Sequence, residues 1–78
     1  MSEKLSPLPA IRVIKVLEKA GFKKIRQRGS HVFMQHSDSR STVVPLHKGE
    51  DLGPGLIRKI LRDTEISRKE FFRLIKKR

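Results

Sequence analysis

Three consecutive residues, Gly29-Ser30-His31, form the segment of this chain best suited to chemistry. They follow a basic run, residues 23–28, that contains no acidic side chain to offset its charge. Histidine is the side chain whose ordinary pKa lets it give or take a proton near neutral pH. A histidine beside a surface that attracts phosphate points to proton transfer next to a bound phosphate, and RNA cleavage requires such a transfer.

RNA can be cut without a metal when its own 2′-hydroxyl attacks the adjacent phosphate. That route needs a base, an acid and cations that stabilise the extra charge on phosphorus. We expect His31 to act as the base or the acid. Arg26 and Arg28 lie on one face of the adjoining strand and are expected to hold the phosphate, because arginine can contact it through two N–H groups. Lys24 is expected to help, and Gly29 and Ser30 to complete the RNA-binding surface.

The chain has two further histidines, His36 and His47. His47, with Lys48 beside it, follows the third predicted strand and could supply the second proton-transfer group or a phosphate contact. An equally good interpretation is a loop histidine that bonds to the backbone. His36 is expected to be exposed beside a polar turn. The spacing of the three histidines matches no common zinc pattern and the chain has no cysteine, so we expect no metal and no cofactor.

Composition limits the class of protein. A chain of 78 residues is one small domain, in which an active site must be a shallow surface feature. Its 19 lysines and arginines against 8 acids give a net charge of +11, which favours a polyanionic partner such as nucleic acid or an acidic protein. We find no signal peptide and no apolar run of the ~18–20 residues that span a membrane. A cytoplasmic protein without membrane contact is therefore expected.

The order of elements follows from periodicity and from turn residues. Apolar residues at helical spacing predict a helix over residues 9–20, with Gly21 as its C-terminal cap. Three short strands are predicted between residues 22 and 46, with turns at 29–30 and 37–40. A loop over 49–55 precedes a helix that Pro54 can start. Ser67 and Glu70 then predict a capping box at the start of a last helix, with Ile66 packing on Phe71.

This order, α-β-β-β-α-α, predicts an α+β fold in which helices cover one face of a three-stranded antiparallel sheet. The other face of such a sheet can remain open to solvent. Alternation along the second strand places His31, Phe33 and Gln35 on one side and Val32 and Met34 on the other. Residues 1–8 are expected to be a flexible segment, and residues 9–78 a single domain.

The residues also resemble a known family, the HicA toxins of toxin–antitoxin pairs. The similarity is carried, in order along the chain, by residues 17–22, 26–31, 44–47, 52–61 and 66–71. It implies a fold similar to double-stranded-RNA-binding domains, with helices packed on a three-stranded antiparallel sheet. It also implies cleavage of mRNA without a metal and inhibition by a HicB-like antitoxin. The catalytic histidine of the family's Gly-Ser-His motif corresponds to His31.

The alternative is a non-catalytic RNA-binding module with a similar fold, which would use shape and phosphate contacts. Proteins that bind single strands usually present several stacking aromatic residues. This chain has no tyrosine or tryptophan, and only Phe33 of its four phenylalanines is expected on the open face. That composition favours duplex or structured RNA over base-specific reading of single strands.

Overall fold

The computed structural model describes residues 4–77 and confirms the predicted α+β class. Its longer elements follow the order α-β-β-β-α-α, and a pair of two-residue strands is added to them. The elements are β1 (Leu8–Pro9), α1 (Ala10–Lys19), β2 (Lys23–Arg28), β3 (His31–Gln35), β4 (Ser41–Pro45), β5 (Asp51–Leu52), α2 (Pro54–Thr64) and α3 (Arg68–Lys76).

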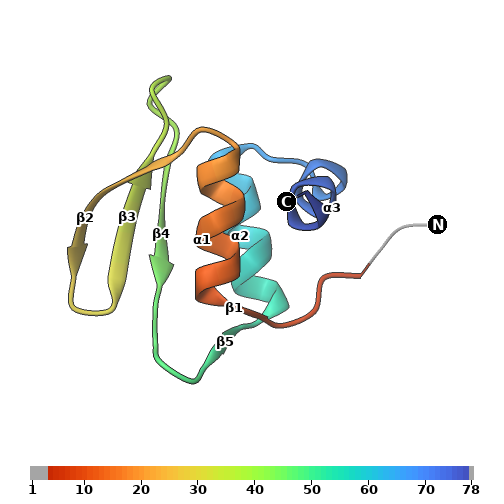
Figure 1. Cartoon of the computed structure of the whole chain (residues 1–78), viewed down its shortest axis with the longest axis horizontal. Coiled ribbons are helices and arrows are strands. Elements are labelled where there is room, and N and C mark those ends of the chain that lie inside the picture. The colour runs from red at the N-terminus through yellow and green to blue at the C-terminus, as the bar shows by residue number, and fades with distance from the viewer. Residues whose placement is uncertain (1–3, 78) are drawn as a thin grey trace.

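The molecule has three layers (Figure 1). Strands β2, β3 and β4 form an antiparallel sheet with β3 in the centre. Helices α1 and α2 lie against one face of this sheet, and α3 packs on α1 on the side away from it. Every helix therefore lies on one side of the sheet, and the opposite face is left uncovered.

Alternation along the strands decides which side chains enter the core. Val32, Met34 and Val44 are fully buried under the helices, while their neighbours in sequence face outward or stay half-buried. Apolar residues of α1 recur at helical spacing, and Val13 and Leu17 are fully buried against the same core. Burial of this kind stabilises the fold by about 1.5–3 kcal/mol for each large apolar side chain.

The predicted helix ends are confirmed. Gly21 follows α1 with φ +99°, a left-handed conformation that glycine adopts without strain. Pro54 is the first residue of α2. The Ser67 hydroxyl accepts a hydrogen bond from the Glu70 backbone N–H (3.0 Å) and so caps α3. The Glu70 carboxylate forms an ion pair with Arg73.

Sequence reasoning missed the small β1–β5 ladder. Leu8 pairs with Leu52 and Pro9 with Asp51, so the predicted loop over 49–55 contains a strand. A two-residue strand is too short to show an alternating pattern in the sequence. It is recognised only from its pairing with the other strand in the folded structure. Of the segment expected to be flexible, residues 1–3 lie outside the described residues, while Leu5 and Leu8 pack against the core. No helix among the described residues is long and apolar enough to cross a membrane.

The prediction that His36 is simply exposed is wrong. Its imidazole packs edge-on against Phe22, with ring centroids 5.2 Å apart, and its side chain is 23% exposed. The Asp38 backbone N–H donates to His36 Nδ1 (3.1 Å). The end of β3 comes close to the residues that follow α1, and the ring fills the space between them.

Candidate active site and nucleic-acid interface

The Gly29–Ser30 turn brings the basic strand and the histidine together. Strand β2 ends at Arg28 and β3 begins at His31, and these two residues pair directly across the ladder. Gly29 has φ +56°, as a tight two-residue hairpin turn requires at its first central position. The Gln27 side-chain amide donates to the Gly29 carbonyl (3.0 Å) and holds the turn.

The face of the sheet away from the helices is named here the open face. Its residues form three rows across the strands, because directly paired residues point to the same side of a sheet. The rows are Arg28–His31–Pro45, Arg26–Phe33–Val43 and Lys23–Gln35–Ser41. Successive rows are two residues apart along a strand, a distance of about 6–7 Å.

In the first row, Arg28 and Pro45 flank His31. Cβ atoms of directly paired residues lie about 4.5–5.5 Å apart, so the guanidinium and the imidazole can reach one phosphate together. Both side chains are exposed. Pro45 lacks a backbone N–H and is tolerated because β4 is an edge strand.

A bulge in β2 decides which basic residues share this face. Arg26 pairs with Phe33, but Lys24 pairs with Met34, so Ile25 is an extra residue between them. One inserted residue reverses the side on which the preceding residues point. Lys24 therefore lies on the side of buried Met34, away from the two arginines, and Lys23 takes a place on the open face.

The structure thus brings Arg26, Arg28 and His31 together and does not bring Lys24 to them. Sequence reasoning missed Lys23, because the bulge leaves no signal in a strand whose six residues are all exposed. It also missed the pairing of Arg26 with Phe33. That pairing could have been found by counting outward from the two-residue turn, since 28 opposes 31 and 26 then opposes 33.

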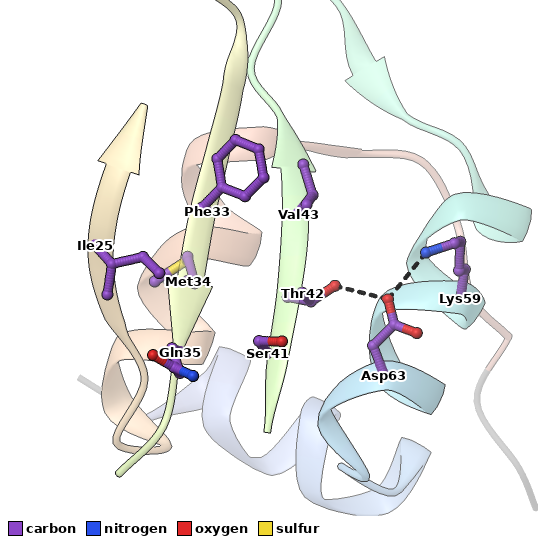
Figure 2. Close-up of a pocket in the computed structure, with 9 residues that line it drawn as sticks. All are labelled: Ile25, Phe33, Met34, Gln35, Ser41, Thr42, Val43, Lys59 and Asp63. Carbon is purple, nitrogen blue, oxygen red and sulfur yellow. Dashed lines mark hydrogen bonds and ion pairs between the residues drawn. The ribbon is translucent and has the colours of Figure 1, made fainter. Parts of the chain in front are cut away.

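Arg26 and Phe33 form the closest aromatic contact on the open face. The guanidinium carbon of Arg26 lies 4.6 Å from the centroid of the Phe33 ring, in a cation–π arrangement. Figure 2 shows Phe33 and Val43 on neighbouring strands, within a shallow depression of about 340 Å³. Ile25, at the bulge, borders the same depression and is 56% exposed.

At the edge of β4, polar residues from α2 border the other side of this depression. Asp63 accepts hydrogen bonds from the Thr42 hydroxyl (3.0 Å) and the Lys59 ammonium (2.9 Å), as the dashed lines in Figure 2 mark. The bond from Lys59, followed by that from Thr42, holds the pKa of the Asp63 carboxyl below its ordinary value. The negative charge of this carboxylate is paired with the Lys59 ammonium, which reduces its repulsion of an anion on the open face.

His47 lies at the same end of the sheet as His31. The Leu46 backbone N–H donates to the Ser30 carbonyl (2.5 Å), so the residues that precede the two histidines are hydrogen-bonded to each other. The His47 side chain borders a depression of about 250 Å³ together with Glu50 and Asp51. The His47 carbonyl accepts from the Glu50 N–H, which forms an exposed turn that contains Lys48.

Among residues 4–77, no three histidine, aspartate or glutamate side chains lie together where they could hold a metal ion. The arrangement on the open face offers instead one imidazole and several fixed cations. Arg26 and Arg28, two residues apart on β2, can bind consecutive phosphates. The imidazole of His31, across the ladder from Arg28, can exchange protons with a bound ribose or phosphate.

Comparison with known proteins identifies the family of this chain. No curated protein matched the chain. A sequence model described as "HicA toxin of bacterial toxin-antitoxin" matches residues 12–66, from the first turn of α1 to the residue before the Ser67 cap. The match includes every residue of the open face and both histidines at its end. With more than half of its length matched, this chain belongs to the HicA toxin family of bacterial toxin–antitoxin systems.

Proposed function

We propose that this toxin is a metal-independent RNA endonuclease that cleaves mRNA in the cytoplasm and is held inactive by a HicB-like antitoxin. The observation that carries the proposal is the direct pairing of Arg28 with His31 at the end of an uncovered basic sheet face. An exposed imidazole beside a guanidinium can supply one of the two proton transfers, and part of the charge stabilisation, that phosphodiester cleavage by the 2′-hydroxyl requires.

In the proposed reaction the ribose 2′-oxygen attacks the adjacent phosphorus. A bond forms between O2′ and phosphorus, and the bond between phosphorus and O5′ of the next nucleotide breaks. One group removes the proton of the 2′-hydroxyl, and another gives a proton to the leaving O5′. The products are a 2′,3′-cyclic phosphate and a 5′-hydroxyl.

His31 carries one of these two proton transfers, and His47 is the candidate for the other. The hydrogen bond between Leu46 and Ser30 keeps the two histidines at one end of the sheet. Arg28 stabilises the additional negative charge on the phosphate, and Arg26 binds a phosphate one row away. Lys48 is exposed in the turn that follows His47 and adds a further cation beside it, and Gly29 and Ser30 are proposed to contact the RNA at the hairpin turn.

The antitoxin is proposed to cover the open face. This face holds Arg26, Arg28 and Lys23 with no acid in its three rows, so a partner with acidic side chains complements its charge. A protein seated there would also block access to His31. The same surface explains both RNA binding and inhibition.

The test is cleavage of RNA in EDTA by the wild type and by His31→Ala. His31 is exposed at the start of β3, so its truncation leaves the core intact, and circular dichroism should confirm the fold. We expect His31→Ala to lose about 10²–10⁴-fold in rate and to keep its RNA affinity at the same salt concentration. His36→Gln, at the residue that follows β3, is the matched histidine control. Its fold should be checked in the same way, because His36 packs on Phe22, and it should cleave as the wild type does.

Binding without cleavage by the wild type would reject the ribonuclease and leave an RNA-binding module. Equal cleavage rates for the wild type and His31→Ala would show that His31 takes no part in the proton transfers. The pH dependence of the rate should be bell-shaped if two groups exchange protons. His47→Gln should remove one limb of that profile if His47 is the second group.

A further inference from the structure

We propose that the open face holds one unpaired nucleotide beside the scissile phosphate, with its base stacked on Phe33. This proposal rests on the proposed function in one respect: His31 and Arg28 mark the position of the scissile phosphate. It adds the substrate class, which is RNA that is single-stranded at the point of cleavage.

Phe33 is the phenylalanine that the core does not use. All four phenylalanines lie in the described part of the chain. Phe22 and Phe71 are 1% and 0% exposed, and Phe72 packs on Phe71 in the helical layer. Phe33 instead lies on the open face, opposite Val43 and near the exposed Ile25 (Figure 2).

The surroundings of Phe33 combine an apolar platform with cations. A base stacks on a ring of this kind regardless of its identity, because every base has an aromatic face. Arg26 lies over the ring and Arg28 is on the same strand two residues away. A neutral lipid or an apolar peptide carries no anion that could pair with these guanidinium groups, whereas a nucleotide offers both a flat base and an anionic phosphate.

The spacing of the rows fits a single nucleotide. The row of Phe33 is separated from the row of His31 by two residues of strand, about 6–7 Å. A base on Phe33 therefore places its neighbouring phosphate near His31 and Arg28. The Arg26 guanidinium, which covers the ring in the free protein, moves to a phosphate when the base takes its place. Stacking of a base on an aromatic ring is stronger than an exposed cation–π contact, so the exchange is favourable.

The proposed chemistry also needs an unpaired nucleotide. In-line attack requires O2′, phosphorus and O5′ to lie on one line. A regular A-form helix holds the 2′-oxygen out of that line, whereas an unpaired nucleotide can rotate into it. A base fixed on Phe33 would hold the rotated conformation. The sequence, with only one aromatic residue expected on this face, predicted duplex or structured RNA. The proposal keeps structured RNA as the substrate but places one unpaired nucleotide, in a loop or bulge, on Phe33.

The experiment uses fluorescence, since the natural chain contains no tryptophan or tyrosine. Phe33→Trp in a His31→Ala background gives a protein with one indole and no expected cleavage. We expect an unstructured single-stranded oligonucleotide to quench this indole. A duplex RNA of equal length should not, at the same salt concentration. Phe72→Trp in the same background, in the helical layer, is the matched control and should not be quenched by either RNA.

A second variant measures the contribution of the ring. Phe33→Leu keeps an apolar side chain on the strand and removes the aromatic face. We expect it to weaken binding of the single strand by about fivefold or more, and to leave duplex binding unchanged.

The outcomes separate this proposal from the proposed function. Quenching by the single strand together with a wild type that does not cleave would keep the stacking site and reject the ribonuclease. Cleavage that depends on His31, with no quenching and no effect of Phe33→Leu, would overturn the stacking site and keep the ribonuclease. Equal quenching by single strand and duplex would overturn the assignment of an unpaired nucleotide.

Discussion

Substitution of Gly21 by alanine is expected to destabilise the fold for two separable reasons. Gly21 has φ +99°, where any residue with a Cβ atom is strained. A Cβ atom there would also lie 2.8 Å from Nε2 of His36, closer than Cβ atoms of folded proteins approach other atoms, and a tight 3.1 Å from Cδ2. The imidazole must move, and it then loses its edge-on contact with Phe22.

The magnitude follows from these two effects. Left-handed backbone strain costs about 1–2 kcal/mol. An aromatic edge contact contributes about 0.5–1.5 kcal/mol. Reduced freedom of the unfolded chain offsets about 0.4–1 kcal/mol. The net loss in the free energy of unfolding should therefore be about 0.5–3 kcal/mol. A loss of about 1 kcal/mol lowers Tm by about 4–8 °C in a domain of this size.

Urea unfolding of matched variants separates the two effects. Gly49 has φ +80° with no atom within 4 Å of its Cβ position, so Gly49→Ala measures the backbone strain alone. Gly21→Ala should cost more than Gly49→Ala by about the value of the imidazole contact. In a His36→Ala background that difference should vanish, because the obstructing ring is gone. An equal cost of Gly21→Ala in both backgrounds would refute the argument that His36 limits the space.

Two other predictions concern charge. The folded pKa of Asp63 is held below its ordinary value by Lys59 and Thr42, so the stability it contributes is fully present above about pH 4. That contribution is lost as pH falls through the folded pKa. Asp63→Asn should therefore flatten the acid limb of stability measured by urea unfolding, and an unchanged limb would contradict this. Arg28→Ala should reduce the slope of log affinity against log salt for single-stranded RNA by about 0.7, while Arg12→Ala on α1 should leave it unchanged. Equal slopes for both variants would argue against a phosphate at Arg28.

Much of the fold could be read from local patterns. The Gly21 cap, the Pro54 start of α2 and the Ser67 cap each depend on a few neighbouring residues, and the structure has all three. Alternation in β3 placed Val32 and Met34 inside and His31 and Phe33 outside, as the burial shows. These features are local because hydrogen bonds and φ angles within one turn of chain decide them.

The site was predicted less completely. His31, Arg26 and Arg28 share a face because the hairpin turn has two residues, which the sequence displays. Their chemical roles stay predictions, as do those of Gly29, Ser30, His47 and Lys48. Lys24 was grouped with the arginines from its charge and position, and the bulge at Ile25 places it on the other side.

The sequence by itself determined the order of the elements, the position of the tight turn and the face on which the histidine lies. Those features arise from interactions between residues close along the chain. Only the tertiary structure decided the bulge, the β1–β5 ladder, the packing of His36 against Phe22 and the hydrogen bond between Leu46 and Ser30. Each of these features depends on contacts between segments that are far apart in the sequence and pack around a shared core. A pattern of neighbouring residues carries no information about such contacts.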